Sequence, residues 1–119
     1  MQDGQKLIIL GTEYTIQIKS EHDDPVLKEC SGYCDETLHL LVVETMDEEE
    51  KPNDLVGDYV SYQKRTMRHE ILHAFLFECG LGGDVDYSSL GNTHPELMVD
   101  WFARLGPKIW KAWQEADAL

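Results

Sequence analysis

Basic residues are scarce in this 119-residue sequence, and long apolar runs are missing from it. Ten Lys and Arg stand against 23 Asp and Glu, which gives a net charge of −13 at pH 7. A surface of this sign repels phosphate backbones and anionic lipids, so we expect no direct binding to nucleic acid or to a membrane. No apolar run approaches the roughly 20 residues that a transmembrane helix needs. The acidity is most simply a solubility feature; mimicry of nucleic acid toward a basic partner is the alternative.

Cysteine is also rare, and the three cysteines form an odd set: Cys30, Cys34 and Cys79. An odd count without a secretory signal peptide favours a reducing compartment, so we predict a cytoplasmic protein. Cys30 and Cys34 could be half of a structural zinc site, but no second Cys/His pair at the required spacing completes four ligands. We therefore interpret them as free thiols.

The sequence does contain enough apolar material for a folded domain. Its residues are 42% apolar and 28% charged, which is richer in apolar residues than a disordered chain. A chain of this length is too short for two independent cores. We therefore expect a single domain over residues 1–119.

The N-terminal part of the chain predicts a small sheet. Residues 7–19 (LIILGTEYTIQIK) combine an apolar run, a Gly-Thr-Glu turn and period-two alternation, which is typical of a β-hairpin. A polar loop or short helical turn around Pro25, then a turn at residues 31–35, lead to a β-branched, apolar strand at residues 37–45. We expect a three-stranded, mostly antiparallel sheet.

The pattern changes to helical spacing in the second half. A charged loop over residues 46–54 precedes it, with Asn53 or Asp54 as the expected N-cap. Apolar residues then recur every three or four positions from Leu55 to Leu81, and glycines beginning with Gly80 end the helix.

A second helix is expected after the Gly-, Asp- and Ser-rich loop at residues 80–93. Pro95 suits its first turn, with Thr93 or His94 as the cap. Gly106-Pro107 predicts a break, followed by a last amphipathic segment at residues 108–119. The fold class is therefore α+β, a small sheet packed on a long helix with helices after it.

The chemistry concentrates in the sequence HEILH, from His69 to His73. Residues four apart on an α-helix project from nearly the same face, one turn apart, so both imidazoles can reach one Zn²⁺ at about 2.0–2.1 Å. Glu70 leaves the helix about 100° round from His69 and can reach a water on the metal. Zinc lowers the pKa of such a water towards about 7, and Glu70 would act as general base.

An ordinary alternative makes His69 and His73 surface residues, with Glu70 in an ion pair with Arg65 or Arg68. The pentapeptide lies deep inside the strongest helical pattern of the chain, as the zinc interpretation requires. We therefore favour the metal site.

A hydrolytic zinc needs a third protein ligand and an open position. Downstream candidates are His94, Glu96 and Asp100. Glu96 falls in the first turn of the next helix and is the ligand that we predict, with His94 as its rival. Asp100, one turn later, can accept a hydrogen bond from a ligand histidine and so orient it.

This arrangement resembles the gluzincin branch of the zincin metallopeptidases, in which HExxH is followed by a ligand Glu on a second helix and an Asp four residues later. The short chain with a small sheet is most similar to small phage-encoded peptidases and ImmA/IrrE-like domains. The resemblance covers residues 35–105 and implies a zinc peptidase acting on a peptide or protein substrate. It also implies that an edge strand could bind an extended peptide as a further strand.

Larger gluzincins supply a His or Tyr that stabilises the oxyanion, and here His94 and Tyr87 are the candidates. His22 and His39 lie outside the motif, and His39 is expected on a strand. A non-catalytic zincin-like adapter or anti-repressor that binds a protein partner is therefore the alternative function.

Overall fold

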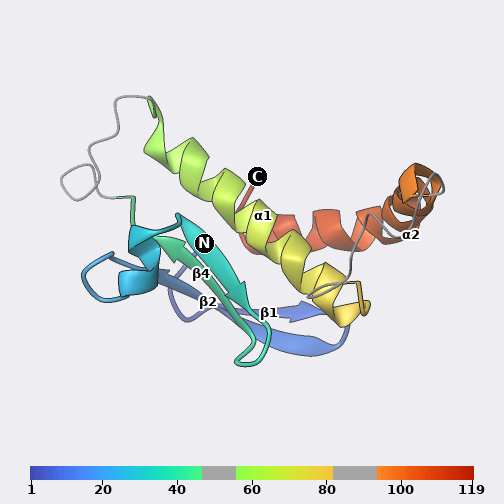
Figure 1. Ribbon diagram of the computed structural model, residues 1–119, viewed down its shortest axis with the longest axis horizontal. Coiled ribbons are helices and arrows are strands. Elements are labelled where there is room, and N and C mark those ends of the chain that lie inside the picture. The colour runs from blue at the N-terminus through green and yellow to red at the C-terminus, as the bar shows by residue number, and fades with distance from the viewer. Residues whose placement is uncertain (47–55, 82–93) are drawn as a thin grey trace.

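The computed structural model describes residues 1–46, 56–81 and 94–119 and has an α+β fold, as predicted. Two helices cover one face of a small sheet (Figure 1). The elements in chain order are β1 (Lys6–Ile9), β2 (Thr12–Lys19), the short 3-10 helix η1 (Pro25–Lys28), β3 (Gly32–Asp35), β4 (Leu40–Glu44), α1 (Tyr59–Glu78) and α2 (His94–Glu115).

The sheet has four strands in the order β1-β2-β4-β3, so the expectation of three mostly antiparallel strands is wrong. The pairs β1/β2 and β3/β4 are antiparallel, whereas β2 and β4 pair in parallel. Residues 31–35, predicted as a turn, contribute the edge strand β3 instead. The reversal follows at residues 36–39, where His39 has a φ of 53°, so the strand expected from residue 37 begins at Leu40.

The predicted N-terminal hairpin is confirmed. Its turn is Leu10-Gly11, with φ values of 49° and 90°, between the paired residues Ile9 and Thr12. Positive φ at both central residues is the geometry of a tight hairpin turn whose twist matches that of the strands. The turn therefore begins one residue before the Gly-Thr-Glu segment expected from the sequence.

A single apolar layer joins the sheet to both helices. On the sheet, Tyr14 and its neighbours face the helices, and the Tyr14 hydroxyl donates a hydrogen bond of 2.8 Å to Glu78 at the end of α1. Burial of this apolar surface is the main force that holds α1 and α2 against the strands. The buried core consists of Leu7, Ile9, Tyr14, Ile16, Leu41, Val43, Met67, Ile71, Ala74, Phe75, Ile109, Ala112, Ala116 and Ala118.

The long helix α1 begins later than the sequence pattern suggested. Its N-cap is Asp58, whose carboxylate accepts hydrogen bonds from the Ser61 amide at 3.0 Å and the Ser61 hydroxyl at 2.7 Å, so the expectation of Asn53 or Asp54 is wrong. The last helical residue is Glu78 and the C-cap is Cys79; Gly80 follows with a φ of 75°, so a glycine ends the helix as predicted.

Helix α2 begins at His94 with Pro95 in its first turn, as predicted, but it does not break at Gly106-Pro107. Proline removes one helical hydrogen bond and costs about 3 kcal/mol in a helix interior. The buried residues Ile109, Ala112 and Ala116 follow at helical spacing and offset that cost by packing on the core. No helix in the described part of the chain is long and apolar enough to cross a membrane.

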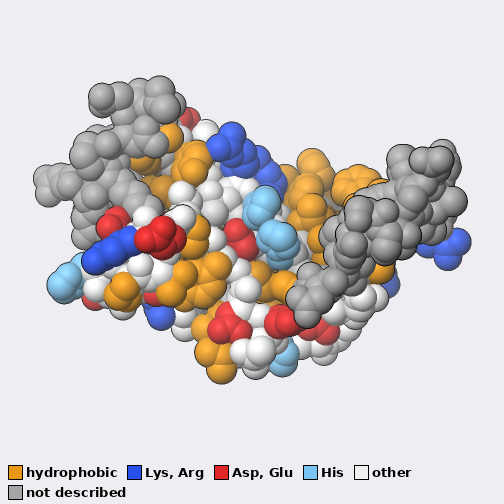
Figure 2. Space-filling model, in the orientation of Figure 1, with side chains coloured by type: hydrophobic (Ala, Val, Ile, Leu, Met, Phe, Trp, Pro, Cys, Tyr) orange, Lys and Arg blue, Asp and Glu red, His pale blue; other side chains and the backbone are white. Residues whose placement is uncertain are grey.

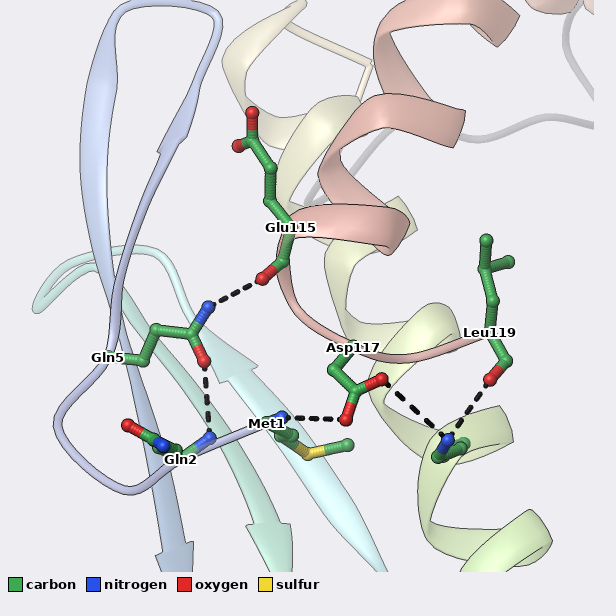
Figure 3. Close-up of polar contacts among 7 residues, drawn as sticks. Met1, Gln2, Gln5, Glu115, Asp117 and Leu119 are labelled. Carbon is green, nitrogen blue, oxygen red and sulfur yellow. Dashed lines mark hydrogen bonds and ion pairs between the residues drawn. The ribbon is translucent and has the colours of Figure 1, made fainter.

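Polar contacts tie the end of α2 to the first residues of the chain (Figure 3). The N-terminal ammonium group lies 3.3 Å from Asp117, which also lies 3.9 Å from Lys64 of α1. The Gln5 amide donates a 2.7 Å hydrogen bond to the backbone oxygen of Glu115. The far end of α2 is thereby fixed against both β1 and α1.

The edge strand β3 approaches α1 most closely at Gly32. A β-carbon at this position would lie 2.7 Å from Thr66 Cγ2 and 2.7 Å from the backbone oxygen of Val42. One neighbour is a backbone atom of the paired strand β4, which cannot move without disturbing the sheet, and the other is the short side chain of Thr66 on α1. Only glycine permits this distance between β3 and α1.

We predict that Gly32→Ala lowers the free energy of unfolding by about 1–3 kcal/mol, the usual range for overpacking. Urea unfolding followed by circular dichroism measures it. Gly57→Ala is the matched control, because a β-carbon there meets nothing within 4 Å. Equal midpoints for the two variants would show that the close approach at Gly32 is unimportant.

Candidate metal centre

The two histidines of the HEILH segment lie together on the exposed side of α1. Their Nε2 atoms are 3.0 Å apart, and their ring centroids are separated by 4.7 Å. Figure 2 shows this pair of histidine side chains in the middle of one face of the molecule, with basic side chains beside it along the helix. Met67, Ile71 and Ala74 bury the opposite side of α1, which explains why His69 and His73 face outward.

The geometry of the histidine pair fits a shared Zn²⁺. Two nitrogens bound to one tetrahedral zinc at about 2.0–2.1 Å are about 3.3 Å apart. The 3.0 Å between the Nε2 atoms of His69 and His73 differs from this by only a few tenths of an ångström. Both imidazoles must be neutral to bind metal, and partial burial together with the charge of His69 holds the pKa of His73 below its usual range. The pair therefore suits a metal near neutral pH.

Glu70 lies on the inner flank of the same helix and is only 6% exposed. Burial raises the pKa of its carboxyl group to about 7. The alternative of an ion pair to Arg65 or Arg68 does not occur: the Arg65 guanidinium stacks on a tyrosine, and Arg68 donates a 2.6 Å hydrogen bond to the Ala118 backbone oxygen. Glu70 thus has the pKa of a group that can accept and release a proton near pH 7.

A cavity of about 360 Å³ opens beside this carboxyl group, between α1 and the start of β3. His69 and Glu70 line it from the helix, together with Tyr62 and Arg65, while Gly32 closes it from the strand. The close approach at Gly32 therefore sets the position of one wall. A cavity lined by one member of a histidine pair and by a buried carboxyl group offers the space that a hydrolytic centre needs.

The remaining predicted site residues lie at or outside the limits of the described structure. Glu96, Asp100 and His94 belong to α2, but their side chains are outside the described residues, as is Tyr87 altogether. Among the side chains in residues 1–46, 56–81 and 94–119 that are described, no three His, Cys, Asp or Glu gather closely enough to hold a metal. The third ligand stays a prediction.

The other histidines and cysteines take no direct part in the pair. His39 lies in the β3–β4 turn, not on a strand, with its ring 5.2 Å from that of Tyr14, and His22 lies exposed in another turn. All three cysteines are free, as predicted. Burial, with the nearby charge of Glu70 adding to it, raises the pKa of the Cys34 thiol to about 12, so this thiol is unreactive.

The sequence pattern assigns no role in the site to Arg65 or Tyr62, although both line the cavity. In the sequence Arg65 is expected only as an ion-pair partner of Glu70. It precedes His69 by one helical turn, however, so the two residues share a face of the helix. Tyr62 received no role, yet its hydroxyl lies 3.1 Å from the Ser31 hydroxyl across the cavity. The helical spacing could have indicated Arg65. The contact with Ser31 depends on β3, which the sequence did not reveal.

Comparison of the chain with protein-family models, with curated proteins and with solved structures finds no match.

The burial of Glu70 predicts a pH-dependent stability in the metal-free protein. The carboxyl group holds its proton more tightly in the folded chain, with a pKa of about 7 against an ordinary 4.5. The folded state therefore binds more protons between these values, and the Glu70 contribution to stability falls as the pH rises from about 4.5 to 7. We expect Glu70→Gln to raise the free energy of unfolding by about 1–3 kcal/mol at pH 8 and by much less at pH 4.5.

Urea unfolding of both proteins with a chelator present, at pH 4.5 and pH 8, measures this difference. His73 contributes the opposite dependence because its pKa is lowered, so the comparison between variants isolates Glu70. The control is Glu13→Gln, which removes a carboxylate whose side chain is 58% exposed and should show no such change between the two pH values. A pH-independent effect of Glu70→Gln would contradict the raised pKa.

Proposed function

We propose that this protein is a zinc-dependent peptidase. The observation that carries the proposal is the convergence of the His69 and His73 Nε2 atoms, 3.0 Å apart, on the helix whose buried Glu70 lines a cavity together with His69. A pair of surface histidines with an ordinary salt-bridged glutamate would leave that carboxylate in solvent or next to an arginine. Here the Glu70 side chain is buried, and it forms no ion pair with Arg65 or Arg68.

In this proposal His69 and His73 hold the zinc with Glu96 as third ligand, and Asp100 orients a histidine. When bound, zinc polarises a water molecule and the substrate carbonyl. The Glu70 carboxylate would accept a proton from the attacking water and deliver it to the leaving amine. His94 or Tyr87 is the proposed oxyanion donor.

The edge strand β3 is the proposed docking place for the substrate backbone. It flanks α1 at the cavity and pairs with β4 on its inner side. An extended peptide can add to the outer edge of such a strand through backbone hydrogen bonds. This arrangement would lay the peptide along the cavity wall, past the histidine pair.

Metal binding tests the ligand set. We expect about one zinc per chain, with the affinity reduced by about two orders of magnitude or more in His69→Ala and His73→Ala, as titration calorimetry would measure. His22→Ala removes an exposed histidine elsewhere and should bind zinc normally. Glu96→Gln and His94→Ala identify the third ligand by which of them weakens binding. Equal affinity in all variants would refute the site.

Turnover tests the role of Glu70. Glu70→Gln should retain zinc and lose roughly 100-fold or more in hydrolysis of a peptide substrate, because general acid–base catalysis contributes about 10²–10⁴-fold. Full activity in this variant would refute the mechanism. Zinc binding without turnover in the unaltered protein, together with partner binding that survives Glu70→Gln, would instead support the non-catalytic adapter.

A further inference from the structure

A second cavity of about 370 Å³ continues the first toward the N-terminal end of α1. Tyr62 and Arg65 line both cavities, so the two spaces meet at these side chains. We call the two neighbouring cavities together the α1 groove; its lining residues extend along α1 from Asp58, at the start of the helix, to His69 and Glu70. Arg65 stands in this groove one helical turn before His69, which places it about 6 Å further along the helix axis.

Arg65 differs from its cationic neighbours on α1 because, among the described residues, its guanidinium contacts an aromatic ring and not the end of the chain. Lys64 lies 3.2 Å from the backbone oxygen of Leu119, and Arg68 lies 2.6 Å from that of Ala118, so both hold the end of the chain. Arg65 is exposed and has no carboxylate partner among the residues that the structure describes. Asp58 lines one of the two cavities and Glu70 the other, and within the described part of the chain neither carboxylate forms an ion pair with the Arg65 guanidinium, which can therefore receive an anion.

Two contacts hold this guanidinium in place. Its carbon lies 4.9 Å from the centre of the Tyr62 ring, a cation–π distance. The Tyr62 hydroxyl in turn lies 3.1 Å from the Ser31 hydroxyl, at the residue before β3. The planar face of Arg65 is therefore covered, and its five N–H groups keep their capacity to donate to a planar anion.

We infer that Arg65 is a specificity residue that selects substrates carrying a carboxylate about two residues from the scissile bond. The inference rests on the proposed function and names its substrate class. An extended peptide rises about 3.3 Å per residue, so the 6 Å helical step between His69 and Arg65 spans about two residues. Carboxylates accept the paired hydrogen bonds that a guanidinium donates, and they can come from an acidic side chain or from a C-terminus.

Pools of hexapeptides test this inference. Each pool has Glu or Gln fixed at one position, and every peptide has an amidated C-terminus. With the zinc-loaded protein we expect pools with Glu two residues from the cleaved bond to show about tenfold higher kcat/KM than the matching Gln pools. This ratio should fall to about one in Arg65→Gln and be partly kept in Arg65→Lys. Lys111→Gln, which removes an exposed cation outside the groove, should keep the full ratio.

Pools with a free C-terminal carboxylate distinguish the two sources of the anion. A preference for the free end over the amidated end, lost in Arg65→Gln, would assign the site to a terminal carboxylate, whereas a Glu preference in amidated pools assigns it to an acidic side chain. Cleavage that ignores charge in both sets would overturn the inference and leave the peptidase proposal standing.

A binding experiment covers the case in which the peptidase proposal fails but Arg65 still selects carboxylates. It measures binding of the same pools, as labelled peptides, to zinc-loaded Glu70→Gln by fluorescence anisotropy. Tighter binding of carboxylate-bearing pools that disappears when Arg65→Gln is added supports the inference even without turnover. Charge-selective binding together with no cleavage by the unaltered protein would overturn the proposed function alone.

Discussion

Met67, Ile71 and Ala74 lie fully buried against the sheet, and this contact fixes the rotation of α1 about its own axis. With that rotation set, the 100° step between successive helical residues decides the environment of every polar group in the HEILH segment. His69 and His73 face outward together, while Glu70 turns inward to the cavity beside β3. A different rotation would separate the carboxyl group from its low-dielectric surroundings and leave its pKa unchanged.

The same burial sets the charge of the centre. Desolvation disfavours the charged form of any group, so it raises the pKa of Glu70 and lowers that of His73. Near pH 7 Glu70 is therefore only partly ionised in the metal-free protein, and His73 carries less positive charge than an ordinary histidine. One face of this strongly acidic chain therefore carries a site of low charge, with basic side chains of α1 beside it. The lowered pKa of His73 reduces the number of protons that a divalent metal would have to displace from this residue.

The sequence predicted what depends on local spacing and missed what depends on distant contacts. The helix around His69, its end at Gly80 and the first hairpin follow from periodicity and from residues with special backbone preferences. Strand β3 could not be predicted in this way, because glycine is typical of turns and the close contact with α1 that requires Gly32 is not visible in the sequence. Pro107 was expected to break a helix that tertiary packing keeps continuous. Helical spacing also predicted the site residues His69, Glu70 and His73 on α1. It could not predict the wall of the cavity that β3 provides.

The parallel pairing of β2 with β4 has a consequence for how the centre assembles. Each hairpin closes through a short turn, but the ladder that joins them brings together segments separated by residues 20–39. Closing that longer loop costs entropy that is recovered only when α1 covers the joined strands. One wall of the cavity belongs to the second hairpin and the other to the helix. In a fragment that lacks the first hairpin, β4 has no partner strand on the side where β2 pairs with it. We therefore expect that a short peptide containing the HEILH segment does not form the metal centre by itself.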